Sequence, residues 1–130
     1  MSNNQASVTD IAAMKYVSLA TFRKTGAEVK TPVWIAGDGD TLYVYSEGHA
    51  GKVKRVRNNG KARVAPCDIR GKVQGDFVDT TARMVEDSAE FDRAFVALKA
   101  KYGWQMTIAT LLSRLSCKIN NRVVIALQLI

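Results

Sequence analysis

The residues best suited to chemistry in this sequence are cations at the start of a short predicted helix. Residues 52–59 read Lys-Val-Lys-Arg-Val-Arg-Asn-Asn and follow a glycine-bounded turn, Gly48–Gly51, after a strand-like segment that ends at Ser46. The first turn of a helix has N–H groups without intrahelical partners and carries the positive end of the helix dipole. Lys52 and Arg55, three residues apart, share one helix face. The pattern predicts a site for an anion, such as a cofactor phosphate, with the Ser46 hydroxyl as a further ligand.

A run of cations on a helix more often marks a solvated face than a ligand site. Here Val53 and Val56 would form the buried side of the helix, so the neighbouring cations need not be wholly exposed. The net charge of +7 is concentrated in this region, because eight cations between residues 52 and 72 face a single acidic residue, Asp68. Such a surface favours nucleic acid, an anionic membrane surface or a phosphorylated ligand.

Other kinds of catalytic site have no support in the sequence. The single histidine, His49, cannot build a histidine-rich metal site, and Cys67 and Cys117 have no metal-ligand spacing. We expect two free thiols, no secretion signal, no membrane span and a location in the cytoplasm. Neither a Ser-His-Asp set nor a paired-acid motif can be found, which favours a protein whose cofactor carries the chemistry.

The elements that must position these residues predict an α+β fold. Turn residues and β-forming runs indicate strands at 16–22, 29–36, 41–46, 62–66, 73–85 and 122–130. Helices are expected at 8–13, starting near Thr9 or Asp10, at 52–59, after Asp87 up to Gly103, and at 106–115. Pro32 cannot donate a hydrogen bond to a neighbouring strand, so it must lie on an edge strand or at a β-bulge, and Gly26 indicates a hairpin turn. We expect one domain over 1–130, with residues 1–5 disordered and an antiparallel sheet that closes into a small barrel.

Four short motifs occur in a fixed order: LATFRKTG at 19–26, TPVW at 31–34, LYVYS at 42–46 and GKVKR at 51–55. Together they resemble the flavin/deazaflavin oxidoreductases, which have the FMN-binding split β-barrel of pyridoxamine phosphate oxidase. Within that superfamily the chain is most similar to small coenzyme F420-dependent enzymes of actinobacteria. Segments 101–104 and 122–127 add to the resemblance, which covers residues 6–130.

The resemblance implies a homodimer with two cofactor sites at the subunit interface and hydride transfer between a deazaflavin and a small organic substrate. The site residues it implies fall into three groups, beside the ring, at the phosphate and at the helix start: Thr31, Pro32, Val33 and Trp34; Ser46, Lys52 and Arg55; Ala50 and Gly51. A strand at 63–67 would flank the site, and Trp104 and the segment around Arg70 are candidates for the second subunit's contribution. The role of His49 stays open.

The cofactor itself is a choice between coenzyme F420 and FMN, since both have a phosphate. Further cations favour F420, whose glutamate tail is a longer anion: Lys54, Arg57, Lys61 and Arg63. A cofactor carrier or a nucleic-acid-binding protein is the alternative from another class. Against nucleic acid, the cations cluster at one helix start, and no RNP, KH or zinc-finger signature appears.

Overall fold

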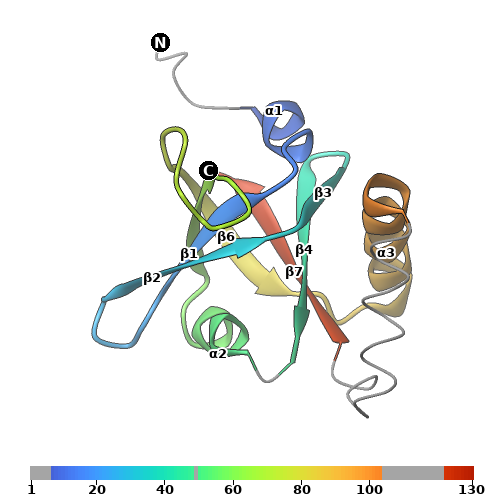
Figure 1. Cartoon of the computed structure of the whole chain (residues 1–130). Coiled ribbons are helices and arrows are strands. Elements are labelled where there is room, and N and C mark those ends of the chain that lie inside the picture. Colours follow the sequence, from blue (N-terminus) through green and yellow to red (C-terminus); the bar gives the residue numbers. More distant parts are fainter. Residues whose placement is uncertain (1–6, 49, 104–121) are drawn as a thin grey trace.

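The computed structural model describes residues 7–48, 50–103 and 122–130. Within them, seven antiparallel strands form one curled sheet in the order β2-β1-β5-β6-β7-β4-β3, accompanied by three helices (Figure 1). The strands are β1 Val17–Phe22, β2 Glu28–Val33, β3 Ile35–Asp38, β4 Thr41–Glu47, β5 Lys61–Pro66, β6 Val78–Met84 and β7 Arg122–Leu129. The helices are α1 Val8–Ala12, α2 Gly51–Asn58 and α3 Ser88–Tyr102. The predicted α+β split barrel is confirmed.

The main core fills the inside of the curled sheet. It forms because alternate residues of each strand point inward, as in β6, where buried and exposed residues alternate from Val78 to Ala82. In β4, Leu42 and Val44 face this core, while the intervening Tyr43 belongs to a smaller cluster with Ala94 on α3. Largest among the fully buried side chains are Ile11, Leu19, Ile35, Leu42, Leu98, Ile125 and Leu127.

The two edges of the sheet are joined by a single residue. We expected one strand over 29–36, but β2 and β3 are separate strands at opposite ends of the sheet order, and Trp34 connects them. The prediction was wrong because the chain turns here from pairing with β1 to pairing with β4. Pro32 lies on the edge strand β2 opposite Ser18, as its missing N–H required.

Helix α2 covers one part of the sheet, and α1 and α3 pack against another. α2 packs against β1 and β6 and buries Val53 and Val56, as predicted, so each valine gains about 1.5–3 kcal/mol of transfer free energy. α1 packs against β3 and β4, and α3 lies along the same two strands (Figure 1). Thr9 and Asp10 lie in the first turn of α1, near its start as expected, and the N-cap is Ser7, whose side chain forms a reciprocal capping box with Asp10.

α3 begins and ends as the sequence indicated. The Asp87 carboxylate accepts a hydrogen bond from the backbone N–H of Glu90 at 2.9 Å. Gly103 ends the helix with φ of +56°, a conformation that glycine adopts without strain, and Gly26 adopts φ of +93° in the hairpin turn.

Several predictions differ from the structure or lie outside the described residues. The strand expected at 73–85 is shorter, because glycines and polar residues from Gly71 to Asp76 form a loop that makes one bridge, Cys67 to Val73. Cys67 is a buried free thiol. The helix expected at 106–115, the disorder expected at 1–5, and His49, Trp104 and Cys117 lie outside the described residues. Among the helices described, none has the length and apolar character needed to cross a membrane.

Candidate functional site

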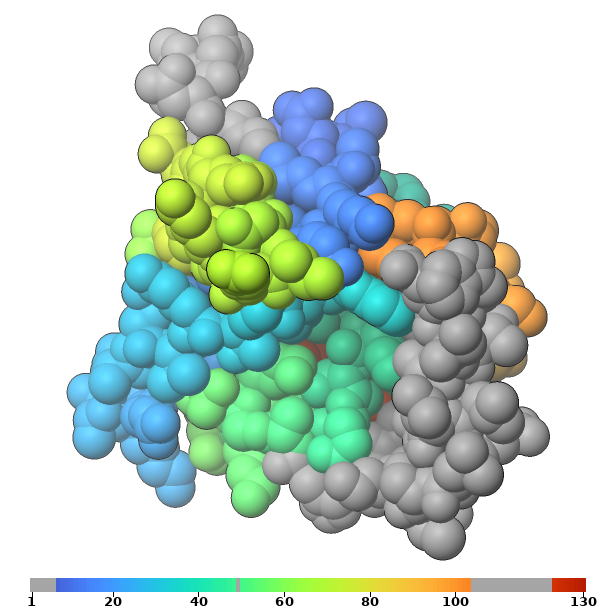
Figure 2. Space-filling view, in the orientation of Figure 1, coloured from blue at the N-terminus to red at the C-terminus, as the bar shows by residue number. Residues whose placement is uncertain are grey.

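A cavity of about 240 Å³ lies where the β2–β3 corner faces α2. The surface is hollowed between the cyan β2–β3 segment and the green α2 (Figure 2). Four of the residues that line it were predicted to bind a cofactor, Pro32, Val33, Trp34 and Lys52, and three were not, Tyr16, Tyr45 and Ile69. The fold therefore brings the predicted ring strand and the predicted phosphate helix to one cavity, although they lie about twenty residues apart in sequence.

One wall of the cavity is aromatic and held from behind. The Trp34 indole stacks on the Tyr102 ring of α3, with centroids 4.6 Å apart and planes 12° apart. Tyr45 meets Phe95 of the same helix edge to face at 6.4 Å. Rigid aromatic walls suit a flat conjugated ring, because offset stacking adds to the gain from apolar burial.

The start of α2, whose Lys52 lines the cavity, carries positive charge. Ala50 is the N-cap and offers no side chain to the helix N–H groups, and the first turn contains no acidic residue. The backbone carbonyl of Ala50 accepts from Val53 and Lys54. Among the described residues, the N–H groups of Gly51 and Lys52 have no backbone acceptor and are available to a ligand. An anion is the complement of such a helix end.

Arg55 is directed back over this first turn by two neighbours. Its Nε donates to Thr21 Oγ1 of β1 at 2.7 Å. A Cβ built on Gly51 would lie 2.8 Å from Arg55 Nη1, so the glycine leaves the space that the guanidinium occupies. The contact between the two explains why a residue without a side chain begins α2 and places the guanidinium beside the free N–H groups.

Lys52 is the cation that reaches the cavity. Burial lowers the pKa of its amine, the neighbouring Arg55 lowers that pKa further, and Glu47 opposes the shift. Burial and then Arg23 likewise lower the pKa of Arg55. Arg55 thus acts unfavourably on Lys52, and Arg23 acts unfavourably on Arg55, so an anion at this position would stabilise the group.

The remaining predicted residues lie around the cavity rather than in its lining. Thr31 is half-buried on β2 opposite Leu19. Ser46 is buried, and its hydroxyl donates to the backbone carbonyl of Glu47 at 3.2 Å, so its proton is already engaged. Ala50 packs against the main core at the start of α2.

Sequence reasoning missed residues that only the fold brings to the site. Thr21 and Arg23 are some thirty residues from α2 in sequence, and no local spacing connects them with Arg55. One cation assigned to the anionic tail is otherwise engaged: Arg63 pairs with Glu28 at 3.3 Å and with Asp79 at 3.2 Å. In the part of the chain that the structure describes, no cluster of His, Cys, Asp and Glu could hold a metal ion.

Comparison with known proteins agrees with this fold. Residues 4–129 match the family described as Pyridoxamine 5'-phosphate oxidase. No curated protein matches the chain.

Three solved structures have similar folds. HutZ, the heme storage protein of Vibrio cholerae, is 15% identical, with a TM-score of 0.70 over 91% of this chain and 83% of that one. A FAD-binding protein of Mesorhizobium loti is 17% identical, with a TM-score of 0.61 over 92% and 82% of the two chains. A conserved hypothetical protein of Mycobacterium tuberculosis is 17% identical, with a TM-score of 0.67 over 97% and 82%. At these identities, the similarity establishes the fold alone.

Proposed function

The chain belongs to the pyridoxamine 5'-phosphate oxidase family, and from that premise we propose that it is an oxidoreductase that uses coenzyme F420. The observation that carries the proposal is that Lys52, at the uncapped start of α2, lines the same cavity as Trp34 and Pro32. A ring beside the β2–β3 corner and a phosphate at α2 would thus be held by one continuous surface.

The residues of the chain divide the binding work between them. The N–H groups at the start of α2, the Lys52 amine and the Arg55 guanidinium would hold the phosphate, and Thr21 keeps the guanidinium in place. Trp34, Pro32 and Val33 would contact the ring and exclude water from it. When bound there, the cofactor would supply hydride chemistry toward an electron-poor double bond, with solvent as the source of the proton.

FMN is the alternative cofactor; the Mesorhizobium loti protein of similar fold is described as FAD-binding, and FAD is also a flavin. The cations left for an anionic tail are Lys54, Arg57 and Lys61, all exposed on or after α2, because Arg63 is paired. These three cations lie along α2 or after its end, and Arg23 lies close to Arg55. This extended positive charge favours the longer anion F420.

A fluorescence titration of the protein with oxidised F420 and, in parallel, with FMN tests the proposal. We expect saturable binding with one ligand per subunit and tighter binding of F420. The double substitution Lys52→Ala with Arg55→Ala should raise Kd by at least about 100-fold, because charge-assisted hydrogen bonds contribute about 1.5–3 kcal/mol each and about 1.4 kcal/mol corresponds to a tenfold change. A control that removes the same charge, Lys24→Ala with Lys99→Ala, alters two exposed cations and should leave Kd unchanged.

The outcomes separate the alternatives. Preference for FMN would make the protein a flavin oxidoreductase of the same fold, and binding without turnover of activated alkenes or quinones would make it a cofactor carrier. Equal Kd values for the two double variants would show that the phosphate does not lie at α2. Affinity for nucleic acid that falls steeply with salt, in a protein that binds neither cofactor, would favour a nucleic-acid-binding role.

A further inference from the structure

The last turn of α3 holds the backbone next to Trp34 with an unusual set of hydrogen bonds. The Lys101 ammonium donates to three backbone carbonyls: those of Ala12 at 2.7 Å, of Ile35 at 2.5 Å and of Met14. These carbonyls belong to the end of α1, the start of β3 and the connection before β1. Among the described residues, no carboxylate forms an ion pair with Lys101, so the ammonium is satisfied by backbone alone.

Tyr102 completes the arrangement from the next position. Its hydroxyl accepts a hydrogen bond from the Ile35 N–H at 2.9 Å, and its proton can go to the carbonyl of Lys15 at 2.8 Å or of Ile35 at 3.0 Å. Since the Ile35 carbonyl already accepts from Lys101, the Lys15 carbonyl is the better acceptor for that proton. Burial raises the pKa of Tyr102 to about 12, which keeps the hydroxyl protonated at neutral pH.

Both backbone polar groups of Ile35 are therefore bonded to side chains of α3. The residue that precedes Ile35 is Trp34, which joins the two sheet edges and lines the cavity. In the described part of the chain, no ladder hydrogen bond fixes Trp34, because β2 ends at Val33 and β3 begins at Ile35. The Tyr102 ring also covers one face of the Trp34 indole.

We propose that Lys101 and Tyr102 are positioning residues that fix the Trp34 indole as the wall of the ring site. The bonds from Lys101 and Tyr102 to the Ile35 backbone, together with the stacked ring, are called the clamp below. The proposal rests on the proposed function only in naming the ligand, since the clamp is a property of the free protein. Lys101 holds the backbone carbonyl of Ile35, and Tyr102 holds both the Ile35 N–H and the Trp34 indole. Without these bonds the corner can rotate, and the cavity loses its flat wall.

The test follows the signal of Trp34 in the full chain with Trp104→Phe, which leaves Trp34 as its only tryptophan. Tyr102→Phe keeps the stacked ring and deletes the hydroxyl, and Lys101→Met deletes the ammonium. The matched control is Lys99→Met, since Lys99 is an exposed lysine of the same helix turn. Near-ultraviolet circular dichroism and acrylamide quenching of Trp34 fluorescence are measured without ligand, and Kd for F420 and FMN is measured afterwards.

We expect both clamp variants to lose part of the Trp34 dichroism and to be quenched more easily, while the control matches its parent. Kd should rise about tenfold in Tyr102→Phe. This substitution is the smaller change, so it still tests the proposal if Lys101→Met fails to fold. An unchanged Trp34 signal in a folded Tyr102→Phe variant would overturn the clamp. If the parent binds neither cofactor, the proposed function fails, and the ligand-free Trp34 signal still decides the clamp.

Discussion

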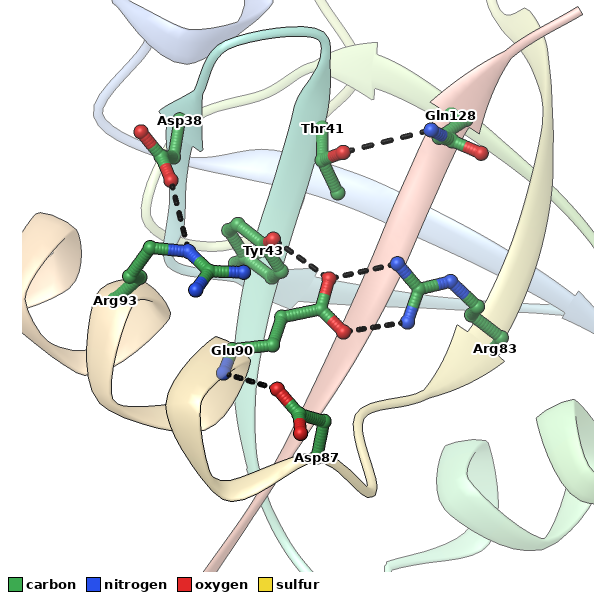
Figure 3. Close-up of polar contacts among 8 residues, drawn as sticks. All are labelled: Asp38, Thr41, Tyr43, Arg83, Asp87, Glu90, Arg93 and Gln128. Atoms are coloured by element: carbon green, nitrogen blue, oxygen red, sulfur yellow. Dashed lines mark hydrogen bonds and ion pairs between the residues drawn. The ribbon is translucent and has the colours of Figure 1, made fainter.

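Replacement of Glu90 by glutamine should remove one of the strongest polar contacts of the fold. Glu90 lies near the start of α3, and its carboxylate accepts two hydrogen bonds from Arg83 of β6, at 2.8 and 2.7 Å, and one from the Tyr43 hydroxyl of β4 at 2.8 Å (Figure 3). Only 13% of the Glu90 side chain is exposed. The carboxylate thus ties α3 to two strands that are separated by β7 in the sheet.

The size of the expected loss of stability follows from the pKa of the Glu90 carboxyl. The hydrogen bonds from Arg83, ahead of that from Tyr43, lower the pKa of Glu90 from 4.5 to about 2, against the opposing effect of burial. A shift of this size corresponds to about 3 kcal/mol, and we expect roughly 2–3 kcal/mol because half of the Arg83 side chain lies in solvent. Since the folded pKa is the lower one, this stability is present above pH 4.5 and is lost as the pH falls toward 2.

Urea denaturation followed by far-ultraviolet circular dichroism at pH 7, 5, 3.5 and 2.5 measures the effect. The free energy of unfolding of Glu90→Gln should lie below that of the wild type by the full amount at pH 7 and 5, and the gap should shrink at pH 3.5 and 2.5. Glu86→Gln is the matched control, because Glu86 is exposed and precedes the same helix. A constant gap across this pH range would refute the assignment of the stability to the Glu90 carboxylate.

Three further perturbations test other parts of the structure. Gly51→Ala should displace the Arg55 guanidinium, whose Nη1 would lie 2.8 Å from the new Cβ, and should raise Kd for the cofactor about tenfold. The thermal midpoint should stay within a few degrees, because alanine favours the helix. A Kd equal to that of the wild type would contradict this prediction. Burial lowers the pKa of Lys101 from 10.5 to about 8. The stability of the wild type relative to Lys101→Met should therefore rise between pH 8 and 10.5, where only the unfolded chain keeps the proton. Urea denaturation at pH 7.5, 9 and 10 measures this, and a difference in the free energy of unfolding that does not change with pH would show that the amine titrates normally. Sedimentation velocity at micromolar concentration should show a dimer, and a monomer that still binds cofactor would exclude a site shared between subunits.

Local sequence signals predicted most of the strands, the boundaries of α2 and α3 and the cluster of positive charge, because each depends on neighbouring residues. The valines of α2, the Asp87 cap and the stop at Gly103 needed only helical spacing and capping chemistry. The β2–β3 break could not be read in this way, because Thr31 to Ala36 look equally strand-like and the partner strand changes only in the folded chain. Tyr16, Ile69 and Thr21 reach the site from other elements, so their roles depend on the topology of the barrel.

The position of the cavity follows from how this barrel is joined. Among the described residues, β2 pairs only with β1 and β3 only with β4, so both are edge strands and they meet at Trp34. Tyr102 and Lys101 bind the backbone groups of Ile35 on β3, which leaves the edge of β2 beside the cavity. Exposed edges of this kind invite pairing with other chains unless something covers them. A flat polar ring can accept and donate hydrogen bonds along such an edge, and its phosphate would neutralise the cations of α2 beside it. The same junction that leaves the sheet incomplete thus supplies backbone donors, an aromatic wall and positive charge within one cavity. This combination favours a ring cofactor over an extended nucleic acid, whose backbone charges would reach far beyond one helix start.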